Sequence, residues 1–224
     1  MIIAHENQEY ESNVIAEAIK EVYELESKII NSNFDNEFKP TSQNDKFNTS
    51  SYNLRVRLDK EFMNKSVMVI TQRDIYASSN LEDGWWLGYS SGDLLQVVSS
   101  VRLKREDNKP SKTLEVSQEV YKNRLKLLGI HELGHNLVKS SKLKHVSYVD
   151  SKGNRDSLGK HCTDNCCALY EFIDIKTPKP EDGYLLLGDE KRFDAGVDEI
   201  LSRIHKNWFC NDCKDSIKID DRYR

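Results

Sequence analysis

The sequence lacks the features that direct a chain into a membrane or out of the cell. No apolar run approaches the roughly 18 residues needed to cross a bilayer, and the mean hydropathy is −0.69. Residues 1–10 include Glu6 and Glu9 and have no basic segment followed by an apolar stretch, unlike a signal peptide. We therefore expect a soluble, cytoplasmic protein that has no membrane partner.

Charge of one sign is not concentrated anywhere in the chain. The 33 basic and 37 acidic residues give a formal net charge of −4 and are spread along the sequence without a long single-sign block. A protein that binds nucleic acid usually carries a basic arm or stripe. No nucleic-acid partner is therefore expected.

The length of 224 residues and the apolar content of 38% suit one hydrophobic core. We expect a single domain over residues 1–224, with an N-terminal α/β lobe over about 1–138 and a C-terminal lobe over about 139–224. Helices interleaved with a few strands, followed by a helical end, predict an α+β fold with a mixed sheet and a small, mostly helical C-terminal lobe.

Apolar residues at helical spacing predict four helices, over about 9–25, 54–62, 116–137 and 197–208. The β-branched run 66–71 predicts a strand buried on both faces. Residues 85–89 and 94–101 predict a hairpin around a Ser-Ser-Gly-Asp turn. The polar stretches 33–51 and 139–160 are expected to be surface loops.

The segment HELGH, from His131 to His135, falls on the predicted long helix. Residues four apart on a helix face the same way, so His131 and His135 can offer imidazole nitrogens to one zinc ion. Glu132 can then act as the general base on a water molecule that zinc activates, which is the chemistry of a metallopeptidase. Close packing of another segment would explain Gly134, which lowers helix stability by about 1 kcal/mol relative to alanine.

A peptidase zinc requires a third protein ligand. The contiguous pattern HExxHxxGxxH is absent, because Val138 and Ser141 occupy its glycine and third histidine positions. The candidates that remain are His145, Asp150, Asp156 and His161. We favour His161, because Gly159 stands two residues before it and Cys162 directly follows it. A carboxylate third ligand, Glu171 or Asp150, is the alternative.

All five cysteines lie in the last third of the chain, at positions 162, 166, 167, 210 and 213. An odd number of cysteines in tight clusters favours metal binding in a reducing compartment over a disulfide framework. Four thiolates would form a closed structural zinc site, and the spacings C-x4-C and C-x2-C are sterically suitable. The spacing leaves Cys166 and Cys167 as alternatives.

These motifs resemble the archaemetzincins, whose metzincin zinc motif is joined to a four-cysteine zinc site. In that family the last histidine is followed directly by a cysteine, then by four residues, a second cysteine, one residue and a methionine, with a CxxC further on. Cys162, Cys167, Cys210 and Cys213 have this arrangement. Residues 70–75 and 97–103 also resemble the family's segments before the active-site helix, so the likeness covers about 66–213.

The resemblance implies a metzincin-like fold and two zinc ions. It implies catalytic zinc on His131, His135 and His161, with Glu132 as the base. It also implies structural zinc on four cysteines: Cys162, Cys167, Cys210 and Cys213. The implied partner is a peptide or protein substrate.

The chain departs from the family pattern in three places. Roughly twenty residues are inserted between Leu137 and Leu158, Leu169 stands at the methionine position, and the stretch between Cys167 and Cys210 is long. These departures keep open a second interpretation, in which the chain is a non-catalytic, zinc-stabilised binding module of the same fold.

Two further expectations concern the segments before the active-site helix. Residues 94–101 are expected to form either an exposed edge strand that could pair with an extended peptide beside the metal or an ordinary internal strand. Asp74 and Arg102 are expected to form a structural ion pair or to contact substrate.

Overall fold

The structure is a computed structural model, and it describes residues 1–32, 47–48, 62, 64–76, 87–91, 94–104, 116–141, 143–149, 155–164, 167–170, 185–187 and 207–223. The predicted loop over 33–51 and the predicted helices over 54–62 and 197–208 lie almost entirely outside the described residues.

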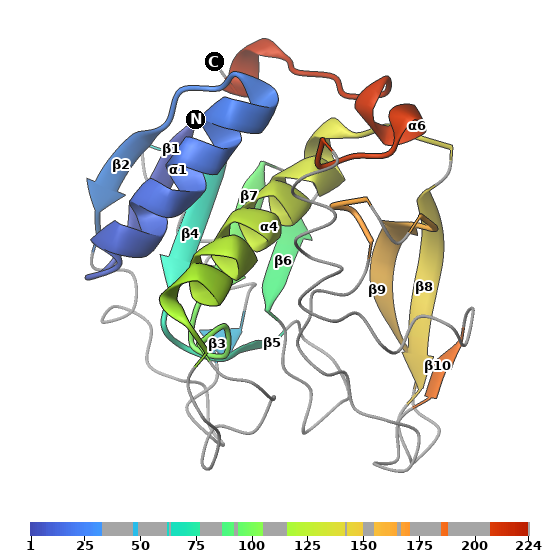
Figure 1. Cartoon of the computed structure of the whole chain (residues 1–224), viewed down its shortest axis with the longest axis horizontal. Coiled ribbons are helices and arrows are strands. Elements are labelled where there is room, and N and C mark those ends of the chain that lie inside the picture. The colour runs from blue at the N-terminus through green and yellow to red at the C-terminus, as the bar shows by residue number, and fades with distance from the viewer. Residues whose placement is uncertain are drawn as a thin grey trace.

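The centre of the fold is a five-stranded sheet with the order β2-β1-β4-β7-β6 (Figure 1). Its strands are β1 (Ile2–His5), β2 (Lys28–Asn31), β4 (Val67–Thr71), β7 (Leu95–Ser99) and β6 (Gly88–Ser91). The first four run parallel, and β6 is antiparallel to β7. Every residue of β1, β4 and β7 is buried, as expected for parallel strands covered on both faces.

The predicted strand over 66–71 and the predicted hairpin are confirmed as β4 and the β6–β7 pair. Of the two alternatives for residues 94–101, the structure has the internal strand and not the edge strand. Strand β7 pairs with β4 on one side and with β6 on the other, so β6 lies at the edge. All five residues of β7 are buried, as expected for a strand inside a sheet that is covered on both faces.

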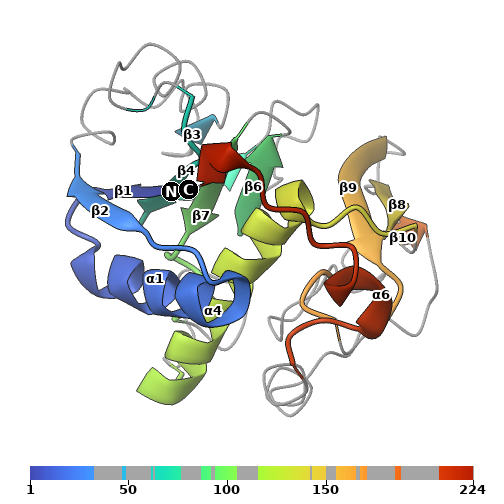
Figure 2. The same ribbon diagram turned by 90° about the horizontal axis from the view of Figure 1, so that it is seen from above.

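Helices α1 (Glu9–Tyr23) and α4 (Gln118–Leu137) cover the same face of this sheet (Figure 2). Both confirm predicted helices. Helix α4 begins after Ser117, whose hydroxyl accepts a hydrogen bond from the Val120 N–H at 3.3 Å, a normal N-terminal cap. None of the described helices is long and apolar enough to span a membrane.

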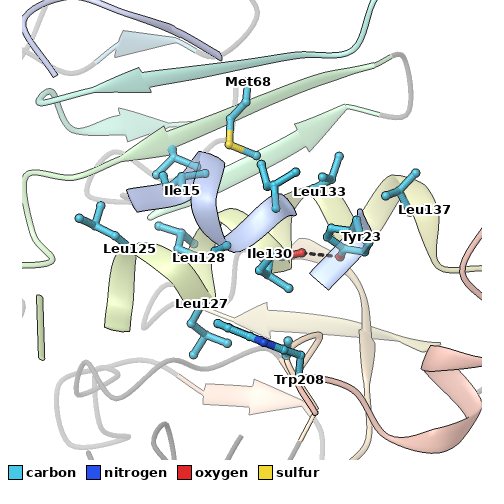
Figure 3. Packing of buried hydrophobic residues seen from close by; sticks show 14 of the residues in the cluster. Ile15, Tyr23, Met68, Leu125, Leu127, Leu128, Ile130, Leu133, Leu137 and Trp208 are labelled. Carbon is cyan, nitrogen blue, oxygen red and sulfur yellow. Dashed lines mark hydrogen bonds between the residues drawn. The ribbon is translucent and has the colours of Figure 1, made fainter. Parts of the chain in front are cut away.

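The two helices pack very closely at Gly129 of α4. A Cβ atom there would lie 2.6 Å from Cγ2 of Ile15 on α1. At the next residue of α4, the Ile130 carbonyl accepts a hydrogen bond from the Tyr23 hydroxyl at 2.9 Å (Figure 3). Leu127 and Trp208 belong to the same buried cluster, on the side of α4 that faces the C-terminal residues. Helix α4 is therefore held between the sheet, α1 and the end of the chain.

Replacing Gly129 with alanine is expected to lower the free energy of unfolding by about 1 kcal/mol. Overpacking typically costs about 1–3 kcal/mol, which outweighs the gain of about 1 kcal/mol in helix propensity. In an Ile15→Ala background the clash is removed, so the same substitution should be neutral or stabilising. Urea denaturation of the four chains in a double-mutant cycle measures this. An equal penalty in both backgrounds would contradict the packing argument.

The C-terminal residues contain a second, three-stranded antiparallel sheet of order β10-β8-β9. Its strands are β8 (Leu143–Val149), β9 (Arg155–Cys162) and β10 (Leu185–Leu187). Two short helices follow, α6 (Asn211–Lys214) and the 3-10 turn η3 (Asp221–Tyr223), and a small parallel pair joins β3 (Phe47–Asn48) to β5 (Ile75–Tyr76) elsewhere in the fold.

Two expectations about the C-terminal residues are wrong where the structure describes them. The polar stretch 139–160 contains two paired antiparallel strands, β8 and most of β9, and the described part of the lobe has more strand than helix. One face of a small antiparallel sheet can be exposed to solvent, so its strands need no long apolar run. A polar sequence therefore does not exclude such a sheet. Val146, Tyr148 and Val149 are β-forming residues that precede a Gly-Asn turn signal.

The chain after α6 returns to the end of α4. Val138 and Ile217 form an isolated antiparallel bridge, and the Lys218 N–H donates to the Leu137 carbonyl at 2.8 Å. Further on, the Tyr223 carbonyl accepts a hydrogen bond from the amino group of Met1 at 3.0 Å. These contacts fix α6 relative to the histidine-bearing helix.

Candidate functional site

Helix α4 brings His131 and His135 together one turn apart. Their Nε2 atoms lie 3.0 Å from each other, and their ring centroids are 4.6 Å apart. Two imidazole nitrogens bound tetrahedrally to one zinc at about 2.0–2.1 Å would be about 3.3 Å apart. The helix therefore places this pair close to the spacing that a shared metal requires.

A third histidine joins them from β9. The ring of His161 lies 5.1 Å from that of His131 and 4.8 Å from that of His135, centroid to centroid. One nitrogen from each ring lies within 4.8 Å of the others. We call these three residues the histidine cluster.

Of the other candidates for the third ligand, only His145 has a described side chain, and it is not in this cluster. His145 is exposed on β8, where it is paired with Lys160 in the strand register. Asp150 and Glu171 lie outside the described residues. Asp156 lies on β9, but the structure does not describe its side chain.

The β8–β9 hairpin explains how an insertion can separate the ligands in sequence and keep them together in space. Strand β8 begins shortly after the end of α4, and β9 runs back alongside β8. Leu143 therefore pairs with Cys162 at the end of the hairpin nearest to α4. Leu158 is an extra residue in the β9 ladder, which pairs Val146 with Gly159 but Ser147 with Ser157. Gly159 next to this bulge has φ of 89°, a conformation that favours glycine.

Main-chain groups orient the two helical histidines. The Nδ1–H of His131 donates to the Ala168 carbonyl at 2.8 Å. In a neutral ring this leaves the lone pair on Nε2, the atom that faces His135. The ring of His135 hydrogen-bonds to the main chain of Lys160 in β9, and burial lowers the pKa of His135 well below its usual value. Neutral imidazoles whose nitrogens converge in this way fit a divalent metal ion.

The side chain of Glu132 lies against Gly88 of the edge strand β6. Its side chain is 4% exposed, and burial raises the pKa of its carboxyl to about 8. A cation held by the histidine cluster would favour the carboxylate and lower this pKa. A Cβ atom at Gly88 would lie 2.1 Å from Oε1 of Glu132. Strand β6 therefore accommodates Glu132 only because residue 88 has no side chain.

Gly134 is required by packing, as its position between the two histidines suggests. A Cβ atom there would lie 2.9 Å from both Cδ2 of Leu169 and the Tyr23 hydroxyl. Leu169, at the position of the family's methionine, is fully buried and packs on α4 between the two histidines. The Leu169 side chain thus provides an apolar surface next to the histidine cluster.

Four cysteines form a second group of donors, which we call the cysteine cluster. Cys162 ends β9, Cys167 lies in the following turn, and Cys210 and Cys213 bracket the start of α6. Their sulfur atoms lie within 4.8 Å of one another, and Cys162 and Cys210 are 3.7 Å apart. A tetrahedral site with zinc–sulfur bonds of about 2.3 Å places sulfurs about 3.8 Å apart. Cys166 lies outside the described residues.

Hydrogen bonds among the thiols of the cysteine cluster lower the pKa of Cys162 and raise the pKa values of Cys167 and Cys213. Neighbouring thiols, first that of Cys167 and then that of Cys213, donate to Cys162 and lower its pKa. The Asp164 N–H donates to the same sulfur at 3.4 Å. A thiolate is the form in which cysteine binds metal, so Cys162 is poised for this role.

Asp74 and Arg102 form the expected ion pair. Two parallel hydrogen bonds of 2.6 and 2.7 Å join the guanidinium to the carboxylate. The Arg102 side chain is 8% exposed, and such a bidentate, mostly buried pair is a strong one. It links the ends of β4 and β7.

The sheet, the two helices on one face and the two donor clusters define a mixed α/β protein with two candidate metal centres. No family model matches the sequence, and no curated protein matches it. The crystal structure of archaemetzincin from Archaeoglobus fulgidus, complexed with malonate, is similar to this chain. The likeness covers 97% of this chain and 100% of that chain, with a TM-score of 0.55 and 17% sequence identity. It shows a distant relationship in fold.

Sequence reasoning missed the groups that orient the ligands. Gly88 acts through the absence of a side chain, and two other residues, Ala168 and Lys160, act through main-chain groups. The residue types at these positions therefore give no indication of their roles. A signal for Gly88 does exist, because glycine inside a strand often marks a close approach of another group. The partner of that close approach, Glu132, is visible only in the fold.

Proposed function

We propose that the chain is a zinc-dependent metallopeptidase with a metzincin-like active site. The observation that carries this proposal is the convergence of His131, His135 and His161 beside a buried glutamate, Glu132. Three neutral imidazoles with an open fourth position are typical of catalytic zinc, whereas four cysteines are typical of structural zinc. The histidine cluster would hold the catalytic ion and the cysteine cluster the structural one.

Bound zinc would supply a Lewis acid that polarises the substrate carbonyl and lowers the pKa of water to about 7. Glu132 would accept a proton from the attacking water at its carboxylate and pass it to the leaving amine nitrogen. Its burial excludes bulk solvent, which strengthens its interaction with nearby charges. Hydrogen bonds to the main chain of Ala168 and Lys160 would orient His131 and His135.

The edge strand β6 is the part of the sheet that would bind the substrate. It pairs with β7 on one side only among the described strands, and Gly88 brings its main chain against Glu132. An extended peptide could add to this edge through main-chain hydrogen bonds, which would place a peptide carbonyl near the histidine cluster. We assign this role to β6 in place of residues 94–101.

Metal content and peptide cleavage test the proposal together. Purified protein is expected to contain two zinc ions per chain, and chelation should abolish cleavage until zinc is restored. His135→Ala should retain one zinc, in the cysteine cluster, and lose cleavage. His145→Ala is the matched control, because this exposed histidine lies outside the cluster, and it should keep both ions and full activity.

A wild-type chain that holds one zinc, unchanged by His135→Ala, would contradict the catalytic site. Two zinc ions without cleavage of any peptide in a diverse library would instead favour the non-catalytic binding module. The position of Leu169 does not distinguish these outcomes, because leucine and methionine both provide an apolar surface.

A further inference from the structure

The two donor clusters share one short stretch of chain. His161 and Cys162 are neighbours at the end of β9, and successive strand residues face opposite sides, so one can serve each cluster. The Cys162 N–H donates to the Leu169 carbonyl at 2.8 Å, and the Tyr170 N–H donates to the Cys167 carbonyl at 2.9 Å. The end of β9 and the turn over 167–170 are thus one hydrogen-bonded unit.

The peptide groups of Ala168 connect this unit to both clusters. The carbonyl accepts the His131 Nδ1–H at 2.8 Å. The N–H donates to the Trp208 carbonyl at 2.6 Å, two residues before Cys210. A path of hydrogen bonds therefore runs from the segment that carries Cys210 and Cys213, through Ala168, to the ring of His131.

The segment before Cys210 has a conformation that other contacts must maintain. Asn207 and Trp208 are consecutive non-glycine residues with φ of 71° and 63°. Such left-handed residues are strained and persist only where the surroundings hold them. A metal ion that ties Cys210 and Cys213 to Cys162 and Cys167 would hold this segment, and with it the carbonyl that accepts from Ala168.

We infer that the cysteine cluster acts as a positioning site for the histidine cluster, so that a metal ion bound by the four cysteines raises the affinity of the three histidines for theirs. This inference rests on the proposed metal sites and extends them, because it makes the second ion part of the assembly of the first. Ala168 is the positioning residue. By thermodynamic linkage, an ion in the histidine cluster must raise the affinity of the cysteine cluster by the same factor.

The test uses cobalt(II) as the probe in the full-length chain. Cobalt bound by thiolates has intense charge-transfer absorption that cobalt bound by imidazoles lacks, so the two clusters can be followed separately, with a competing chelator to measure affinity. Cys210→Ser should weaken cobalt binding by the histidine cluster about 10–100-fold, the usual effect of losing a group that orients a ligand. Cys210 does not contact the histidines through its side chain.

Cys210→His is the matched rescue variant. A Cys3His set is a normal structural zinc site, and Cys210 is partly exposed, which leaves room for an imidazole. This variant should bind metal with its cysteine cluster and restore wild-type affinity at the histidine cluster. The inference is overturned if Cys210→Ser binds cobalt at the histidines as tightly as wild type. It is also overturned if Cys210→His fills its cysteine cluster and yet remains as weak as Cys210→Ser.

The reciprocal measurement decides the matter if either Cys210 variant fails to fold or to bind metal. His135→Ala disables the histidine cluster without removing a contact to Ala168. Its cysteine cluster should bind cobalt about 10–100-fold more weakly than that of the wild-type chain with both clusters filled. Equal affinities would overturn the inference.

These outcomes separate the inference from the proposed function. A chain whose two metal sites are coupled but which cleaves no peptide refutes the peptidase alone. A chain that cleaves peptides with uncoupled metal sites refutes only the positioning role of the cysteine cluster.

Discussion

Peptide hydrolysis is expected to fall about 10²–10⁴-fold when Glu132 is replaced by alanine, while both zinc ions stay bound. A general base contributes a factor of this size, and Glu132 is the carboxylate next to the histidine cluster. Its side chain lies against Gly88 of β6 and is not part of the histidine cluster, so its removal leaves the three imidazoles in place. Steady-state kinetics and metal analysis on the same preparations measure the two effects.

Glu119→Ala is the matched control for this experiment. Glu119 is an exposed residue in the first turn of the same helix, and its loss should leave kcat/KM unchanged. Equal turnover by wild type and Glu132→Ala would refute the proposed mechanism. Loss of zinc together with activity in Glu132→Ala would show that the glutamate supports the metal site instead of the chemistry.

Replacing Gly88 with alanine should lower kcat by about 10²-fold and leave metal binding intact. The added methyl group would lie 2.1 Å from Oε1 of Glu132, so the carboxylate must move. A displacement of about 1 Å at a catalytic group typically lowers the rate by about this factor. The affected group is the base rather than the substrate-binding edge, so kcat should fall more than KM rises.

Ser90→Ala is the control for Gly88→Ala, because it changes a side chain on the same face of β6 without adding an atom. Its side chain lies two residues along β6, so it shares the face of Gly88. This variant should behave as wild type. If Gly88→Ala also retains full kcat, then either Glu132 adjusts at no cost or it is not the base, and Glu132→Ala distinguishes these two possibilities.

The placing of the two helical histidines on one face could be predicted from sequence, because helical geometry alone relates them. His131 and His135 are four residues apart on one periodic segment, and no tertiary contact is needed to place them on the same face. The same is true of α1 and of the buried strand β4, whose patterns are local. Cys210 and Cys213 were likewise recognisable from their short spacing.

His161 could be proposed as the third ligand, but its position could not be predicted. That position depends on where the chain reverses direction between His135 and His161. His161 is 26 positions after His135. The stretch between them is polar and does not read as strand, yet it contains the β8–β9 pair, whose register brings His161 back to α4. The edge strand of the sheet could not be decided from sequence for a similar reason. Which side of β7 is free depends on pairing with β4 and β6, and pairing partners are not a property of a single segment.

The β8–β9 hairpin also has a consequence for the spacing of the three histidines in sequence. Residues added in pairs at the far end of two antiparallel strands lengthen the arm but leave the pairing at its base unchanged, including that of Lys144 with His161. The number of residues between His135 and His161 can therefore change without moving His161 relative to α4, because only the pairing at the base of the hairpin fixes its position.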